Sequence, residues 1–503
     1  MSYLVTFMLS LAWFAFFQSW GSFHDPDAFF HAKIASLMAA QGPLKTFPWL
    51  DLTSLGHDFA DQHFLFHVLL FHFERVFGML GGTQIAAVVF ASLFVTIFYF
   101  VVRKLEIRRP WFWTVLLSIS TFLIVRLSLG KASPLALIWL VLGMFAILKK
   151  KPWLGIVAGL GFALSHGGWI VLLACQTLYL VGEIAFAKVV EDHEWKKVLA
   201  ASSWKVLFST LAGIIFGMVI HPNFPANLSF LWVQVVKIGL ETPYHRVSLG
   251  QEWLPMPVGD LIIGLGFALL VALGIAFGFL FARRMPLDRS RAKASVALGF
   301  VVAGLVALTL KSSRAIEYLV PLFVLWLGTL AMLIDERQLV EEGRSLFRSK
   351  PLRIFVVLLL GAVFFHDVRG SKSMLQDHAY PFTVWHPPMS VLSKQALAGD
   401  RVFHSDWDFF PELFMEDDRL RYIAGLDPTF LLEANPHLSD EYVDITLGHA
   451  TSSDFEKIRD DFHAKFVVIR IDRHAAFARA LEEDQRFIRI YADPQVRVYR
   501  LGE

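Results

Sequence analysis

The sequence predicts a mainly helical membrane protein, a bundle of about eleven transmembrane spans followed by a small α/β domain. Three observations support this fold class. Of the 503 residues, 55% are apolar and only 18% are charged, and the mean hydropathy of +0.53 is typical of a chain that folds in a bilayer. Apolar runs of about 17 to 25 residues, the length that crosses a bilayer, recur up to residue 367. From about residue 369 the sequence becomes charged and alternates between helix and strand patterns.

The apolar runs give the order of the predicted spans. The N-terminal run has no basic start and no small-residue cleavage site, which predicts a retained helix rather than a removed signal peptide. The turn signal Ser165-His166-Gly167-Gly168 separates two closely spaced runs. The spans are predicted at 3–20, 84–102, 111–127, 133–148, 153–166, 168–187, 204–221, 258–282, 294–311, 315–334 and 352–367.

The segment 63–80 is apolar enough to cross a membrane, but it carries several charged and histidine residues. The distribution of Lys and Arg favours a different position, because cytoplasmic loops carry an excess of these residues. If 63–80 does not cross, all the basic clusters between spans fall on the same side as the N-terminus. We therefore predict that 63–80 is an interfacial or re-entrant helix inside one long outer loop, and that the N-terminus is cytoplasmic.

This topology divides the chain into two predicted domains. Residues 1–368 form the transmembrane domain, with long outer loops at 21–83 and 222–257, and 369–503 form an α/β domain on the outer, periplasmic face of a bacterial inner membrane. Within the second domain the pattern predicts a buried strand at 465–470, an amphipathic helix at 472–485, and paired strands at 487–491 and 496–499. The net charge of +2, with basic residues in short clusters, argues against a nucleic-acid partner.

The first outer loop contains an acidic segment, His24-Asp25-Pro26-Asp27. Asp25 and Pro26 suit the cap and first turn of a helix, so a capping role is one interpretation. Two carboxylates at the membrane surface can instead deprotonate an acceptor hydroxyl, or hold a divalent cation such as Mg²⁺ or Mn²⁺. His31 follows on the same predicted helix and can hydrogen bond to a phosphate.

A second polar group, Asp61-Gln62-His63, lies at the far end of the same loop. His63 and His67 are four residues apart, which places both imidazoles on one face of a helix. A zinc pair is one interpretation, although no Glu occupies the position that the HExxH motif requires. A polar face that lines a head-group pocket and a structural role are the others. Asp61, His63 and His67 are therefore candidate head-group ligands, together with His31.

Two further segments carry candidate binding residues. Arg314 begins a late span, and its guanidinium can grip a phosphate with two hydrogen bonds. Glu317 and Tyr318 follow on the same helix as candidate contacts to a sugar or acceptor, while a simple Arg–Glu helix pair is the alternative. In the second domain, Trp407 can stack on a sugar ring or a peptide while its neighbours Asp406 and Asp408 accept hydrogen bonds; a helix cap is the alternative.

In this order along the chain, the acidic first loop, Arg314 with Glu317-Tyr318, and Ser405-Asp406-Trp407-Asp408 resemble the type C (GT-C) polyprenyl-phosphate-dependent glycosyltransferases. This group includes the catalytic subunits of oligosaccharyltransferases. The resemblance implies that Asp25 or Asp27 is the catalytic carboxylate, that Arg314 holds the donor phosphate, and that 404–411 contacts acceptor or donor sugar. The chain departs from the oligosaccharyltransferase pattern at Ser128-Leu129-Gly130-Lys131, which lacks the acidic pair that supplies further metal ligands in those enzymes.

The leading hypothesis is an enzyme that transfers a sugar from a polyprenyl-phosphate or polyprenyl-diphosphate carrier to an acceptor at the outer face. Its expected partners are the polyprenyl-linked sugar and membrane lipids. A lipid or solute transporter and a non-catalytic membrane assembly protein are the alternatives. Transporters usually contain internal repeats and broken helices near the midplane, whereas the polar residues of this chain gather at one predicted face.

Overall fold

The computed structural model describes residues 2–241, 243, 245–281, 288–334, 350–449 and 454–502. Contacts between residues divide the chain into two compact units, each assembled from three separate stretches. Unit 1 comprises Met1–Gln18, Ile85–Met218 and Glu252–His378, and unit 2 comprises Ser19–Gln84, Val219–Gln251 and Ala379–Glu503. Most of the two loops predicted at 21–83 and 222–257 therefore belongs to the same compact unit as the C-terminal segment.

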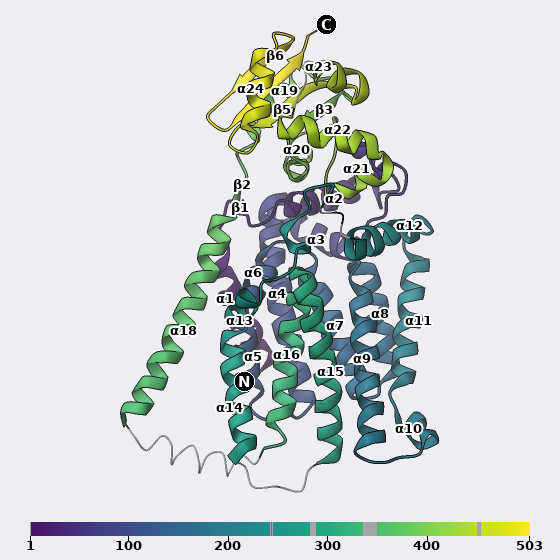
Figure 1. Cartoon of the computed structure of the whole chain (residues 1–503), viewed down its shortest axis with the longest axis vertical. Helices are drawn as coiled ribbons and strands as arrows, with labels where there is room; N and C mark the ends of the chain where they lie inside the picture. The colour runs from purple at the N-terminus through teal and green to yellow at the C-terminus, as the bar shows by residue number, and fades with distance from the viewer. Residues whose placement is uncertain are drawn as a thin grey trace. The chain divides into compact units, whose positions relative to one another are not determined.

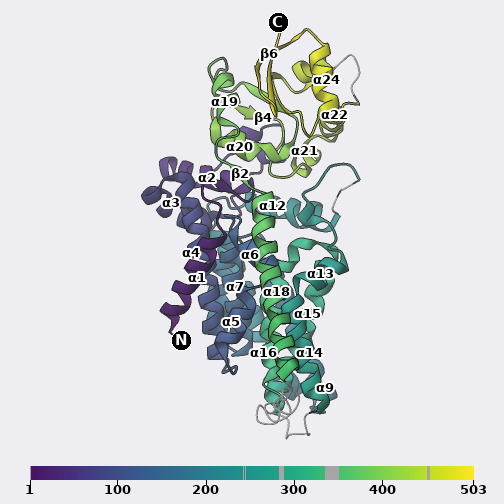
Figure 2. The same cartoon turned by 90° about the vertical axis from the view of Figure 1, so that its left-hand side faces the viewer.

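Unit 1 is built from apolar helices, and each predicted apolar run coincides with one helix or with a pair of consecutive helices over its described residues. The long helices run alongside one another, as Figure 1 and Figure 2 show, with α9 packed on α15, α7 on α8, and α15 on α16. The helices are α1 (Tyr3–Phe17), α4 (Met79–Lys104), α5 (Pro110–Ser118), α6 (Thr121–Ser128), α7 (Ser133–Leu148), α8 (Pro152–Ser165), α9 (Trp169–Val189), α10 (Trp195–Ala201), α11 (Trp204–Ile220), α13 (Val258–Gly264), α14 (Gly266–Phe281), α15 (Arg289–Lys311), α16 (Ile316–Ala331) and α18 (Lys350–Asp377).

Within the described residues, four helical stretches are long and apolar enough to cross a membrane, or up to six if each bent pair counts as one span. The four are α4, α9, α15 and Ser313–Ala331, and the bent pairs are α5 with α6, turned by 69°, and α13 with α14, turned by 78°. Four shorter apolar helices accompany them: α1, α7, α8 and α11. A mainly helical membrane protein is confirmed, whereas the count of eleven crossings stays a prediction.

Glycines allow two helices of unit 1 to approach closely. A Cβ built on Gly159 in α8 would lie 2.2 Å from the carbonyl oxygen of Thr210 in α11, and one built on Gly213 would lie 2.2 Å from the carbonyl oxygen of Ile156. No side chain fits at such distances. Small residues allow this kind of backbone contact between helices in membranes, where apolar burial contributes little to association.

The segment predicted at 63–80 forms a helix that ends before α4 begins. Helix α3 (Phe64–Phe77) packs on α2 (Asp27–Gln41) inside unit 2. Gly78 follows α3 with a φ of 78°, a backbone conformation that favours glycine, and so it terminates the helix. Helix α3 is not among the candidate spans of the described residues, and its interfacial or re-entrant position stays a prediction.

Unit 2 contains a five-stranded sheet of order β4-β3-β5-β7-β6. Strand β3 is parallel to both β4 and β5, whereas β5, β7 and β6 pair antiparallel. The strand predicted at 465–470, the helix at 472–485 and the terminal strand pair are all present. The elements are β3 (Arg401–His404), β4 (Arg421–Tyr422), β5 (Ala464–Arg470), β6 (Phe487–Ala492), β7 (Val496–Leu501) and α24 (Ala475–Glu483).

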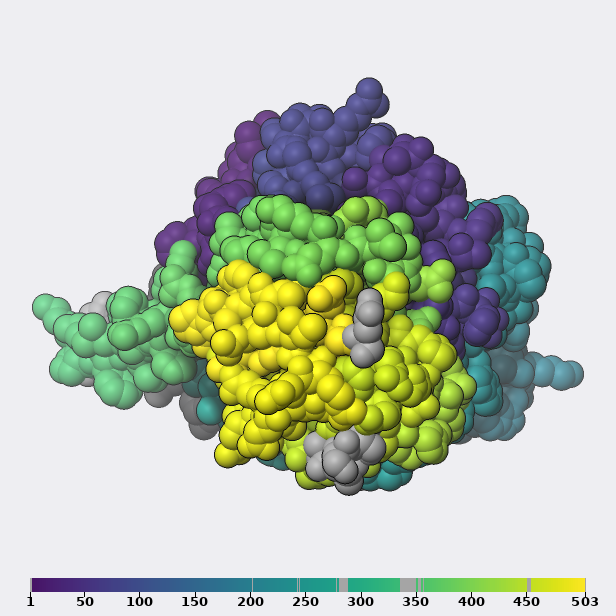
Figure 3. Space-filling model, turned by 90° about the horizontal axis from the view of Figure 1, so that it is seen from above, coloured from purple at the N-terminus to yellow at the C-terminus, as the bar shows by residue number. Residues whose placement is uncertain are grey.

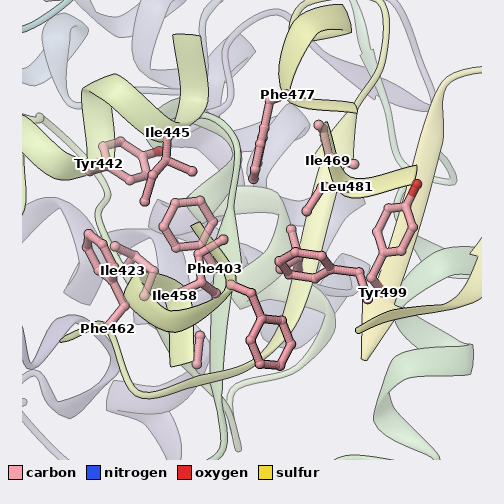
Figure 4. Packing of buried hydrophobic residues seen from close by; sticks show 14 of the residues in the cluster. Phe403, Ile423, Tyr442, Ile445, Ile458, Phe462, Ile469, Phe477, Leu481 and Tyr499 are labelled. Carbon is pink, nitrogen blue, oxygen red and sulfur yellow. The ribbon is translucent and has the colours of Figure 1, made fainter. Parts of the chain in front are cut away.

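An aromatic-rich core holds this sheet together. Phe403 of β3 packs edge-on against Phe462, and Phe477 of α24 also contacts it (Figure 4). Helix α22 (Pro436–Leu447) adds Tyr442 and Ile445 to the same cluster. Burying a side chain of this size contributes about 1.5 to 3 kcal/mol. Figure 3 shows the yellow residues of the C-terminal strands lying against the yellow-green residues that precede them.

The first outer loop is attached to the C-terminal segment by a second, two-stranded sheet. Strand β1 (Ser22–Phe23) pairs antiparallel with β2 (Tyr380–Pro381), so that Phe23 lies opposite Tyr380. Helix α2 continues from this loop and packs on α20 (Phe410–Glu416). Both contacts lie within unit 2. They place the acidic segment at 25–27 in the same compact unit as the one at 406–408.

Candidate functional site

The carboxylates of Asp25 and Asp27 lie at the first turn of α2, directly after β1. The backbone N–H of Asp27 donates a hydrogen bond of 2.9 Å to Oδ1 of Asp25, and Pro26 between them has the helical φ of −63°. The Asp25 carboxylate thus closes the turn before the helix, whose N-cap residue is Pro26 and has no side-chain capping bond; the sequence had suggested Asp25 itself as the cap. Both side chains are half-buried.

Tyr380 links the two acidic segments electrostatically. Burial raises the pKa of the Tyr380 phenol to about 12, and the negative charges of Asp408 and Asp25 contribute to the increase. The pairing of β1 with β2 places Tyr380 opposite Phe23, two residues before Asp25. Helix α20, which begins two residues after Asp408, packs on α2.

Three of the predicted head-group ligands form a buried chain of hydrogen bonds. Nδ1 of His67 lies 2.7 Å from Oδ2 of Asp61, and Nε2 of His67 lies 2.8 Å from Nδ1 of His31. All three side chains are buried, and the ring of His63 lies edge-on to that of His31 with centroids 5.0 Å apart. Burial alone would raise the pKa of Asp61, but the charge and hydrogen bond of His67 hold it below the usual value.

The residues that fix the position of Asp61 in this hydrogen-bond chain were not predicted from the sequence. Nε2 of His221 lies 3.0 Å from the carbonyl oxygen of Asp61, and Oδ1 of Asn223 accepts from the Asp61 N–H at 3.4 Å. Burial lowers the pKa of His221, which favours its neutral form. His221 ends the span predicted at 204–221 and Asn223 lies at the start of the loop predicted at 222–257, so the motif His221-Pro222-Asn223 was the available signal.

The residues do not form a closed metal site. Among the residues that the structure describes, no group of three or more His, Cys, Asp or Glu side chains could hold a metal ion. Both ring nitrogens of His67 take part in hydrogen bonds, so the zinc pair of His63 and His67 does not fit. Asp25 uses one carboxylate oxygen to close the turn before Asp27. The Mg²⁺ or Mn²⁺ ion expected at these two carboxylates stays a prediction, and we derive no step through a metal.

Unit 1 contains a second buried polar network, at the start of α16. Nη1 of Arg314 donates to Oε1 of Glu252 at 2.8 Å, and Nη1 of Arg126 donates to Oε2 of the same carboxylate at 2.8 Å. Nε of Arg126 also donates to Oε2 of Glu317 at 2.9 Å. Arg314 and Glu317, expected as a possible pair, therefore each have a different ion-pair partner.

The network continues around Arg314. The ring of Trp253 lies 5.2 Å from its guanidinium carbon, a cation–π contact, and Nε2 of His166 lies 3.4 Å from Nη2. Burial would raise the pKa of Glu252, but the positive charges of Arg314, Lys131 and Arg126 hold it well below the usual value. Glu252 is therefore ionised across the physiological range.

Arg126 and Glu252 were missed as functional residues. Arg126 lies inside the predicted span 111–127, and an ionisable residue inside a span was the available signal. Glu317 and Tyr318 are buried, with 0% and 4% of their surfaces exposed. A direct contact of Glu317 with an acceptor would require it to leave Arg126.

The segment Asp406-Trp407-Asp408 follows β3, at the carboxyl end of the parallel strands. Nη1 of Arg473, which follows the neighbouring parallel strand β5, lies 3.3 Å from Asp406 and 2.7 Å from Asp408. Nε1 of Trp407 donates to the carbonyl oxygen of Ser248 at 2.9 Å. Ligands often bind outside the carboxyl ends of parallel strands.

Two acidic side chains of this region have raised pKa values. Burial and the neighbouring charge of Asp406 raise the pKa of Asp408 to about 6. Burial raises the pKa of Glu412, in α20, to about 8. The pKa of Asp406 is lowered, because His474 and Arg473 outweigh burial.

The fold matches several solved membrane glycosyltransferases. The archaeal oligosaccharyltransferase AglB from Archaeoglobus fulgidus, solved with an inhibitory peptide and a dolichol-phosphate, aligns with a TM-score of 0.64 and 12% identity over 97% of this chain and 72% of AglB. ArnT from Cupriavidus metallidurans aligns with a TM-score of 0.56 and 13% identity over 99% of this chain and 97% of ArnT. The arabinofuranosyltransferase AftD from Mycobacteria gives 0.58 and 13%, over 100% of this chain and 40% of AftD.

These neighbours are GT-C proteins, and the chain has a GT-C-like architecture, as its sequence resemblance implied. No protein-family model matches the chain, and the curated proteins contain no significant match. At 12% to 13% identity the likeness concerns the fold. The role of each residue therefore has to be argued from this chain's own geometry.

Proposed function

We propose that the chain is a glycosyltransferase that moves a sugar from a polyprenyl-phosphate or polyprenyl-diphosphate carrier to an acceptor at the outer face of a bacterial inner membrane. The GT-C-like architecture along nearly the whole chain supports transfer from a lipid-linked donor. The N-terminus would be cytoplasmic and the C-terminal α/β part periplasmic. Membrane lipids are the second expected partner.

The observation that carries the proposal is the packing of the two acidic segments within unit 2. Strand β1, which precedes Asp25, pairs with β2, and α2 packs on α20, which follows Asp408. The charges of Asp25 and Asp408 also both act on the phenol of Tyr380. General-base catalysis requires the base to lie within hydrogen-bond reach of the proton that it accepts. A hydroxyl bound by the segment at 406–408 would lie within that reach of a carboxylate of the first loop.

The proposed reaction is a single inverting displacement. The acceptor oxygen attacks the anomeric carbon, the bond from that carbon to the carrier phosphate breaks, and the electron pair leaves with the phosphate. The acceptor's proton moves to Asp25 or Asp27. Arg314 stabilises the negative charge of the departing phosphate, because a guanidinium offers two parallel donors to phosphate oxygens.

The remaining candidates bind rather than react. His31, Asp61, His63 and His67 form the polar face proposed for the head group, in the chain of hydrogen bonds described above. Trp407 would stack on a sugar or acceptor, with Asp406 and Asp408 as hydrogen-bond acceptors. Glu317 and Tyr318 are proposed contacts to the sugar or acceptor.

Turnover of a lipid-linked sugar by the purified protein in lipid nanodiscs tests the proposal. Asp25→Asn and Asp27→Asn remove a carboxylate with little change in size, and we expect at least one of them to abolish turnover. Asp58→Asn is the matched control, since Asp58 is exposed in the same loop. Full turnover in both Asn variants would contradict the assignment of the base. A chelator added to the wild-type protein tests the predicted cation, and loss of turnover that Mg²⁺ or Mn²⁺ restores would establish it.

A lipid transporter is the second candidate, because two helix pairs of unit 1 are sharply bent. The pairs α5 with α6 and α13 with α14 turn by 69° and 78°, and broken helices are common in transporters. Movement of a fluorescent polyprenyl phosphate across proteoliposomes tests this function. Transport by the wild-type protein without any consumption of lipid-linked sugar would favour the transporter over the enzyme.

A further inference from the structure

One carboxylate in unit 1 bridges two guanidinium groups. Oε1 of Glu252 accepts from Arg314 and Oε2 accepts from Arg126, each at 2.8 Å. Two oxygens on one central atom, each bonded to a different arginine, reproduce the way in which two arginines hold a phosphate. The side chain of Glu252 therefore occupies a position with phosphate-binding geometry.

The backbone around Glu252 is fastened separately from its side chain. The hydroxyls of Ser312 and Ser313 donate to the carbonyl oxygen of Glu252 at 3.0 and 3.1 Å. The N–H of Ser313 donates to the carbonyl oxygen of Leu254 at 2.9 Å. The carboxylate can therefore leave the arginines by rotation about its side-chain bonds while these backbone contacts stay intact.

The network contains more positive charge than negative. Arg126, Arg314 and Lys131 act on Glu252, and Glu317 is the second carboxylate. Within the described part of the chain, the buried Nη2 of Arg126 has no hydrogen-bond partner. If Glu252 leaves, three cations face one carboxylate, and an anion with several oxygens can satisfy donors that a carboxylate cannot.

The two carboxylates differ in how easily they can leave. The side chain of Glu317 is 0% exposed, whereas that of Glu252 is 26% exposed. Removing a buried charge from its partner is costly, so Glu317 leaves Arg126 less readily than Glu252 does. Glu252 is the member of the network that water, and hence a ligand, can reach.

We propose that Glu252 is a built-in substitute for a phosphate, and that a phosphate ester displaces it to bind between Arg126 and Arg314. The identification of this ester with the lipid carrier rests on the proposed function. The incoming phosphate exchanges places with the carboxylate, without any covalent step. When the spent carrier leaves, Glu252 returns to the two arginines, which lowers the affinity of the site for the product.

The experiment measures binding of polyprenyl phosphate to the full chain in nanodiscs. Glu252→Gln removes the competing charge, and we expect the affinity to increase about tenfold, the size of one charge-assisted contact. Glu241→Gln is the matched control, because Glu241 is an exposed glutamate, and we expect unchanged affinity. Unchanged or weaker binding by Glu252→Gln, with the melting temperature of the wild type, would overturn the proposal.

A second pair of variants tests Arg126 without leaving a buried charge alone. Arg126→Gln combined with Glu317→Gln removes both members of the buried pair, and we expect weaker binding in both the wild-type and the Glu252→Gln background. If the double substitution left the affinity of each background unchanged, Arg126 would not be part of the phosphate site. Inorganic phosphate is added as a competitor: competition shows that phosphate alone suffices, and its absence assigns the site to the lipid-borne phosphate.

Binding by Glu252→Gln and turnover by the wild-type protein test the phosphate site and the proposed enzyme activity independently. Tighter binding by Glu252→Gln in a protein that turns over no lipid-linked sugar supports the phosphate site and contradicts the enzyme. Turnover by the wild type together with unchanged binding by Glu252→Gln supports the enzyme and contradicts the role of Glu252.

Discussion

The two buried polar networks of this protein are built from different kinds of side chain. In unit 1, Arg126 and Arg314 keep their charge at any physiological pH, and Glu252 is held ionised by them. In unit 2, the hydrogen-bond chain from Asp61 through His67 to His31 joins one carboxylate to two imidazoles. The guanidinium groups of the first network suit the binding of an anion, whereas the second network is a row of hydrogen-bonding groups proposed to face the head group.

The largest expected effect comes from removing only one partner of the buried Arg126–Glu317 ion pair in unit 1. Arg126→Leu leaves Glu317 buried without its partner, and an uncompensated buried charge costs about 3 to 5 kcal/mol of stability. Arg126→Leu combined with Glu317→Leu should recover most of this loss. Thermal unfolding in detergent measures both.

The control for that comparison is an exposed ion pair. Arg459 pairs with Asp460 at 2.7 Å on the surface of unit 2, where ion pairs contribute little. We expect Arg459→Leu to leave the melting temperature unchanged. If Arg126→Leu also left the melting temperature unchanged, the pair of Arg126 and Glu317 would not contribute to stability as a buried ion pair.

A smaller effect is expected when the hydrogen-bond chain of unit 2 is interrupted. His67→Phe removes the link between Asp61 and His31 but keeps a ring of similar size in the buried position. We expect turnover to fall by about tenfold to a hundredfold, because a hydrogen bond to a charged group contributes about 1.5 to 3 kcal/mol. His72→Phe is the control, because His72 is exposed on the same helix α3. Unchanged turnover by His67→Phe would exclude this hydrogen-bond chain from the proposed head-group site.

Local patterns predicted the elements well, because periodicity is a property of neighbouring residues. The helix predicted at 133–148 is α7 (Ser133–Leu148), and the strand predicted at 465–470 is β5. Short contacts along the chain were accessible in part. Asp25 was predicted as the cap of a helix with Pro26 in its first turn, whereas Pro26 is the N-cap residue and the Asp25 carboxylate closes the turn before it.

Pairings between distant residues could not be predicted in the same way. Arg126 and Glu252 are separated by 126 residues, and neither the periodicity of a span nor the length of a loop specifies that they meet. His221 and Asp61 are 160 residues apart, and the sequence assigned them to the end of a span and to a loop. The sequence identified which segments carry polar chemistry, whereas the partner of each charge is a property of the packed units.

The smallest expected effect concerns Glu412, a buried carboxyl group whose charge, unlike that of the arginines in unit 1, changes with pH. Its pKa rises from 4.5 to about 8 through burial, so the folded state binds a proton that the unfolded state has lost over this interval. The associated stability is complete below about pH 4.5 and is lost as the pH rises toward 8. Glu412→Gln mimics the protonated form, and we expect it to raise the melting temperature by a few degrees at pH 8 and to leave it unchanged at pH 4. Glu483→Gln, at an exposed position of α24, should change neither value. An equal effect of Glu412→Gln at both pH values would show that packing, rather than a proton, determines its contribution.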